Sequence, residues 1–166
     1  MPDLTHLHPM IVHFPIALLI IGFLVDAISL FVKRDFLEKT GFILLIVGAI
    51  GAIAAYFSGA SAADGLVEAG SLKDAVEVHE SAAELALWII IGAAVFRTAL
   101  VMVRRYAGYY RWIAFAIFFA GVLAVSRTGY YGGELVFKHA AGVTIEFGSS
   151  NSGSIQNGSL ASASNP

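Results

Sequence analysis

Four long apolar segments limit how this 166-residue chain can fold. A helix that crosses a bilayer needs about 20 mostly apolar residues. Segments of this kind lie at residues 11–32, 41–57, 82–103 and 112–126, and the second and fourth need an extra turn from their flanks. Because lipid offers the backbone no hydrogen-bond partner, each segment is expected to cross as an α-helix. The sequence therefore predicts an all-α fold, a four-helix transmembrane bundle.

The composition agrees with a membrane protein and excludes several other classes. Hydrophobic residues make up 58% of the chain and charged residues 13%, against about 45–50% and about 25% in ordinary soluble domains. The net charge of -2 leaves no basic surface for nucleic acid, so the expected partner is the lipid bilayer. The absence of cysteine excludes disulfides, zinc–thiolate sites and covalently attached haem.

Basic residues in the connecting segments predict the orientation. Three lie between the first and second spans and three between the third and fourth, whereas the opposite side carries three in all. Since Lys and Arg accumulate on the cytoplasmic side, both termini are predicted to be extracytoplasmic. The six are Lys33, Arg34, Lys39, Arg104, Arg105 and Arg111; the three are Lys73, Arg127 and Lys138.

The sequence divides into a membrane domain, residues 1–147, and a tail, residues 148–166. The third helix is expected to begin near Leu72 and to extend beyond the outer surface as a short helical extension. Three glycines, Gly129, Gly132 and Gly133, are expected to end the fourth helix. The tail is rich in Ser, Asn and Gly without a core-forming pattern, which predicts disorder.

All five histidines fall on the predicted outer side, and His13, His79 and His139 belong to different helices. A four-helix bundle can bring such helix ends together around a cofactor or a metal. The alternative is that the histidines are interfacial polar residues at helix ends. His8, next to Pro9 at the start of the first helix, fits either interpretation.

Two charges stand inside the spans, Asp26 in the first and Arg97 in the third. Each lies 15 residues beyond the start of its apolar segment, which places both at about 22 Å depth. The matched depth predicts an intramembrane ion pair, because a lone charge in lipid is costly. The alternatives are a proton or ion path, and extension of Arg97 to the cytoplasmic surface.

Two motifs resemble a known family. The segment HPMIVHFPIALLIIGFLVDA begins at His8 and GYYGGELVFKHAAGV begins at Gly129; together they resemble an uncharacterised family of bacterial four-span membrane proteins, domain of unknown function 2231. Ala140 departs from the glycine that is frequent in the family. The resemblance implies a four-helix fold in the bacterial cytoplasmic membrane and implies no reaction. The matching positions are His8, Pro9, His13, Phe14, Pro15, Asp26, Gly59, Asp64, His79, Gly132, Gly133 and His139.

The first functional hypothesis is haem b binding for electron transfer, with a redox partner near the outer surface. Haem needs one or two axial imidazoles in an apolar pocket. His13 and His79 are the favoured axial pair, with His8 and His139 as alternates or as partners of the propionates.

Two other hypotheses stay open. Copper or zinc binding would use the same four histidines, His8, His13, His79 and His139, with Glu80 or Glu84 nearby. A non-enzymatic membrane subunit or a small-ligand carrier would need the histidines only at helix ends. No hydrolase motif is visible, so the sequence assigns no enzymatic reaction.

Overall fold

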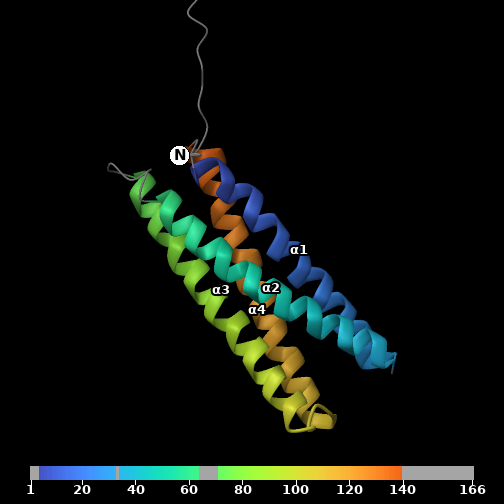
Figure 1. The fold of residues 1–166 in the computed structure, drawn as a ribbon. Helices are drawn as coiled ribbons and strands as arrows, with labels where there is room; N and C mark the ends of the chain where they lie inside the picture. The colour runs from blue at the N-terminus through green and yellow to red at the C-terminus, as the bar shows by residue number, and fades with distance from the viewer. Residues whose placement is uncertain (1–3, 33, 64–70, 140–166) are drawn as a thin grey trace, which may run out of the picture.

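The computed structural model describes residues 4–32, 34–63 and 71–139. These residues form four α-helices, and no strand occurs among them (Figure 1). Each helix contains an apolar stretch long enough to cross a membrane. The predicted all-α fold with four spans is therefore confirmed, whereas the tail at 148–166 lies outside the described residues. The helices are α1 (Leu4–Phe31), α2 (Asp35–Ala63), α3 (Ser71–Met102) and α4 (Gly108–His139).

The helices extend beyond the apolar segments that predicted them. The expected end of the fourth helix at Gly129, Gly132 and Gly133 is wrong, because α4 runs unbroken to His139. An interior glycine costs a helix only about 1 kcal/mol relative to alanine. A broken helix at the membrane would expose several backbone groups without partners, which costs more. The start of α3 at Ser71 agrees with the expected extension.

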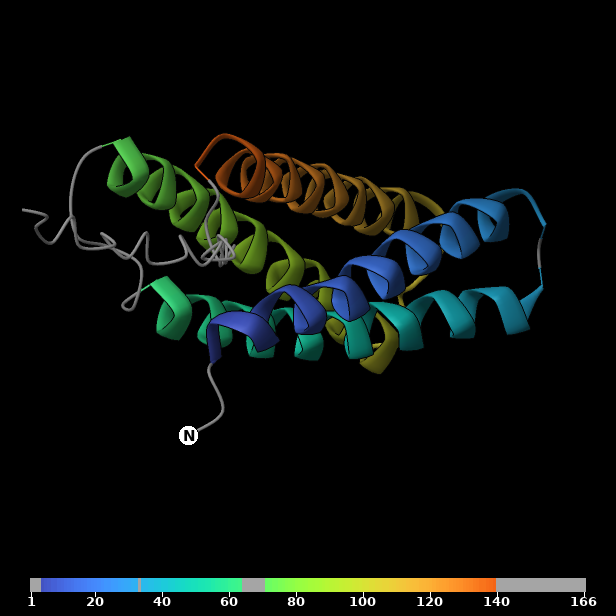
Figure 2. The same ribbon diagram turned by 90° about the horizontal axis from the view of Figure 1, so that it is seen from above.

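The four helices form two antiparallel hairpins that cross at an angle (Figures 1 and 2). In one hairpin α1 packs against α2, and in the other α3 packs against α4. We call the end with the start of α1 and of α3 the histidine end, and the end with the two short turns the arginine end. Among the described residues α1 and α3 make no close backbone contact, so they lie diagonally in the bundle.

In the core of each hairpin, a large buried side chain of one helix packs on a glycine of the other. In the first, the buried side chain of Leu19 in α1 lies over Gly48 in α2; in the second, the buried Ile90 in α3 lies over Gly121 in α4. A Cβ atom would come within 2.7 Å of Leu19 at Gly48 and within 2.5 Å of Ile90 at Gly121. A larger residue at either glycine would force Leu19 or Ile90 to shift.

Equivalent residues of the two hairpins are 71 residues apart in α1 and α3 and 73 residues apart in α2 and α4. Leu19 and Ile90 are 71 residues apart, whereas Gly48 and Gly121 are 73 apart. The buried pair Leu45 and Phe118, in α2 and α4, repeats the second spacing. The two hairpins are therefore structurally equivalent halves, in which α1 corresponds to α3 and α2 to α4.

Candidate functional site

His8 is held at the histidine end by α2. Its Nδ1 lies 2.8 Å from the hydroxyl of Ser58, and that hydroxyl donates to the carbonyl of Ala55 at 2.8 Å. The ring rests on Gly59, where a Cβ would be 2.8 Å from His8 Cε1. Because the single Ser58 proton goes to a carbonyl that can only accept, the hydroxyl accepts from His8 Nδ1–H. This tautomer leaves the lone pair on Nε2.

His79 occupies the corresponding place in the second hairpin. Its ring rests on Gly132, where a Cβ would be 3.2 Å from His79 Cε1. The backbone carbonyl of Thr128 interacts with the ring, as that of Ala55 does with the ring of His8. The two histidines are 71 residues apart, and the glycines and the carbonyls are each 73 apart. We call the glycine and the backbone carbonyl against which each ring lies its cradle. The two imidazoles, on diagonal helices, therefore lie in equivalent cradles.

The two rings are close enough to influence one another. Burial lowers the pKa of His8 below its ordinary value of 6.5, and the nearby imidazole of His79 lowers it further. His8 is therefore neutral at physiological pH, which is the protonation state that can coordinate a metal.

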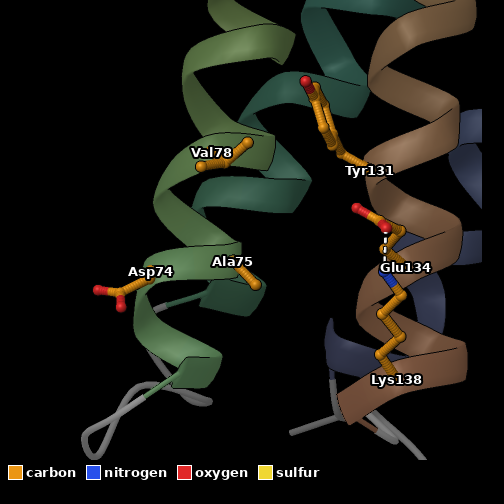
Figure 3. Close-up of a pocket in the computed structure, with 6 residues that line it drawn as sticks. All are labelled: Asp74, Ala75, Val78, Tyr131, Glu134 and Lys138. Carbon is orange, nitrogen blue, oxygen red and sulfur yellow. Dashed lines mark hydrogen bonds and ion pairs between the residues drawn. The ribbon is translucent and has the colours of Figure 1, made fainter.

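One difference separates the two cradles. The position equivalent to Ser58 is Tyr131, which lines a surface pocket together with Glu134 (Figure 3). The buried Nδ1 of His79 has no hydroxyl partner like Ser58 among the described residues, and the Thr128 carbonyl beside the ring does not reach hydrogen-bonding geometry with it. A buried polar nitrogen without a partner is unusual enough to need an explanation.

The other predicted site residues lie elsewhere or outside the description. His13 is on an exposed part of α1, and Glu80 and Glu84 are exposed on α3. His139 ends α4, but its side chain is outside the described part of the chain. No three His, Cys, Asp or Glu side chains in the described part could together hold a metal ion. The structure brings His8, rather than His13, next to His79.

At the arginine end the structure joins Asp26 and Arg97, whose nearest N and O atoms are 2.8 Å apart. Both side chains are nearly inaccessible, with 1% and 2% exposure. Arg97 also donates to the backbone carbonyl of Glu38 at 3.0 Å. Its guanidinium lies 4.6 Å from the ring centroid of Tyr106 and 5.5 Å from that of Phe42.

A second arginine, Arg111 in α4, extends this cluster. It donates to the backbone carbonyl of Ser29 at 2.6 Å and to its hydroxyl at 2.9 Å. The Ser29 hydroxyl in turn donates to the backbone carbonyl of Asp26 at 2.6 Å. Arg111 also forms an ion pair with Glu38 at 3.8 Å. The cluster thus ties all four helices together at this end.

A shallow pocket of about 240 Å³ opens between α3 and α4 near the histidine end (Figure 3). Its charged lining is Asp74 on α3 and an ion pair between Glu134 and Lys138 on α4. The pairing neutralises one of the two carboxylates, so the pocket presents little net charge. Tyr131 forms part of its wall.

Comparison with known proteins agrees with this architecture. Residues 5–145 match the family described as "Predicted membrane protein (DUF2231)". The chain belongs to this family. The family match covers all four helices except the first residue of α1, and it includes His8, His79 and the Asp26–Arg97 pair. No curated protein and no solved structure matches the chain.

Sequence reasoning missed the equivalence of the two hairpins, although a signal was present. His8 precedes Asp26 by 18 residues, and His79 precedes Arg97 by the same number. That shared spacing pairs His8 with His79 and would have directed attention away from His13. No such spacing identifies Ser58, Tyr106 or Arg111, because their contacts depend on how the helices pack.

Proposed function

We propose that this membrane protein binds one haem b between His8 and His79 and transfers electrons at the histidine end. The observation that carries the proposal is the pair of imidazoles in equivalent cradles on diagonal helices. An iron porphyrin with two axial imidazoles needs two such donors facing each other across a bundle. Haem b, when bound, supplies an iron that accepts and donates one electron.

The surroundings of both rings suit axial ligands. A ligating histidine commonly donates its second ring N–H to a carbonyl or a hydroxyl, which sets the tautomer and the ring orientation. His8 makes that bond through Nδ1 to Ser58, so that Nε2 faces the ligand position with a lone pair. At His79, Nδ1 lies on the side of the ring that faces Gly132, which leaves Nε2 as the nitrogen that a bound group would take.

The proposal implies a single haem. At the arginine end the equivalent positions 18 residues further along α1 and α3 carry Asp26 and Arg97, which bind each other. No imidazole is available there among the described residues. A redox partner would therefore have to approach the histidine end.

Absorption spectroscopy tests the proposal directly. Protein purified from cells supplied with haem should show a low-spin b-type spectrum that changes on reduction. His8→Ala and His79→Ala should abolish it, whereas His13→Ala should retain it, because His13 lies on another face of α1.

A matched pair of glycine variants tests the cradle. Gly59→Ala places a methyl group 2.8 Å from His8 Cε1, whereas Gly129→Ala meets nothing within 4 Å. Only the first should lower haem content. A featureless spectrum would overturn the proposal, and a featureless spectrum with stoichiometric copper or zinc would assign the histidines to that metal instead.

A further inference from the structure

Four buried polar atoms at the arginine end have no hydrogen-bond partner among the described residues. They are Asp26 Oδ2, Arg97 Nε, Tyr106 Oη and Arg111 Nε. Asp26 and Arg97 are almost completely buried. A buried polar atom without a partner forfeits its hydration and gains nothing in return, so native proteins contain few of them. Four in one place require a common explanation.

These atoms belong to one cluster rather than to separate defects. Tyr106 interacts electrostatically with Arg97, Asp26, Arg111 and Glu38, and its ring covers the Arg97 guanidinium. Burial raises the pKa of Tyr106 to about 12. The hydroxyl therefore keeps its proton at physiological pH and serves as a donor.

The charges of the cluster and its unused hydrogen-bonding groups define which ligand could satisfy the four unpartnered atoms. Two carboxylates, Asp26 and Glu38, balance two guanidinium groups, Arg97 and Arg111, so the cluster attracts neither cation nor anion. The unused groups are two N–H donors, the Tyr106 hydroxyl and one carboxylate oxygen. A small neutral molecule that accepts and donates hydrogen bonds at once matches this set, and water does both.

We propose that the arginine end binds internal water, which accepts from Tyr106 and from the free guanidinium N–H groups and donates to Asp26 Oδ2. About one or two molecules suffice, because an internal water makes about three hydrogen bonds. This water links α1 of one hairpin to the α3–α4 turn and α4 of the other. The site is independent of the haem proposal.

Removing the Tyr106 hydroxyl tests the proposal, because the two possibilities predict opposite changes in stability. If water links the hydroxyl to Asp26, Tyr106→Phe removes a hydrogen bond and should raise the equilibrium constant of unfolding about threefold to tenfold. If the hydroxyl is truly unpartnered, the same variant relieves a buried polar group and should lower that constant. Tyr109→Phe is the control, because Tyr109 is exposed and should have no effect.

A second measurement needs no variant. An experimental structure that resolves ordered water should show a water molecule within hydrogen-bonding distance of both Tyr106 Oη and the Asp26 carboxylate. Either a stabilising Tyr106→Phe or a water-resolving map without such a molecule would overturn the proposal.

Discussion

Asp26 and Arg97 are tolerated inside an apolar bundle because each compensates the other. Arg97 has three further partners, the Glu38 carbonyl and the rings of Phe42 and Tyr106. Gly41 lets α2 approach closely, since a Cβ there would be 3.2 Å from the Cβ of Asp26. The pair therefore contributes to helix packing, and its loss should destabilise the whole bundle.

Asp26→Asn should lower the free energy of unfolding by about 3–5 kcal/mol, because it leaves the Arg97 charge buried without a counter-ion. Combining it with Arg97→Gln should recover much of that loss. Denaturant titrations of the two single variants and the double variant in detergent measure the coupling. Strictly additive losses would show that the two side chains do not stabilise each other.

Acid should destabilise the protein through His8. Its pKa is lowered in the folded chain, so below about pH 6.5 the unfolded chain binds a proton more readily than the folded chain does. The stabilisation from a neutral His8 is complete above about pH 6.5 and is lost as the pH falls below that value.

His8→Gln removes this titration and leaves a neutral polar side chain. The difference in unfolding midpoint between about pH 7.5 and about pH 5.5 should therefore be smaller in His8→Gln than in the unmodified protein. An equal difference in both proteins would assign the acid sensitivity to other groups.

At the scale of the helices, close packing within each hairpin depends on glycines that face large side chains. Gly48 receives Leu19 and Gly121 receives Ile90 in the same way. Association of helices in lipid relies on such close approach, because apolar burial offers little advantage over contact with lipid tails. The hairpin is therefore the smallest unit in which the packing of this protein repeats.

Gly48→Ala should lower the free energy of unfolding by about 1–3 kcal/mol. The new Cβ would lie 2.7 Å from Leu19 Cδ2 and 2.8 Å from its Cγ, and the buried Leu19 has little room to move. Gly92→Ala is the matched control, since nothing lies within 4 Å of a Cβ at Gly92. It should be neutral or slightly stabilising. Equal effects of both variants on thermal stability would contradict this account.

At the scale of the whole molecule, the equivalent halves meet differently at the two ends. At the histidine end the equivalent residues are identical, His8 and His79, and these are the two imidazoles that we propose as ligands of one haem. At the arginine end they are complementary, Asp26 with Arg97 and Glu38 with Arg111, so they bind each other directly. These ion pairs join one hairpin to the other at the arginine end.

The orientation in the membrane is a further prediction for the whole chain. Six basic residues lie around the two turns of the arginine end and three on the other side, so the arginine end should face the cytoplasm. Topology reporters fused after residue 36 and after residue 150 should report opposite sides, with residue 36 cytoplasmic. A cytoplasmic signal after residue 150 would reverse the orientation and place the histidine end inside.

Hydropathy was sufficient to predict the number of spans, and matched depth was sufficient to select Asp26 and Arg97 as partners. Both inferences rest on the large cost of placing polar backbone or charge in lipid, which a linear sequence displays directly. The continuation of α4 through three glycines was not predictable from local propensity. It follows from backbone hydrogen bonding and from the contact of Gly132 with His79.

Hydropathy did not show which histidine faces the bundle interior, and the tertiary structure decided it. His8 and His13 are five residues apart, about 140° around a helix, so only one of them can face His79. In a soluble helix, polar and apolar faces would show which one. Here the lipid-facing and the interior faces of α1 are both apolar. The sequence therefore determined that the helix spans the membrane, and packing against α2 and α4 determined how it is rotated.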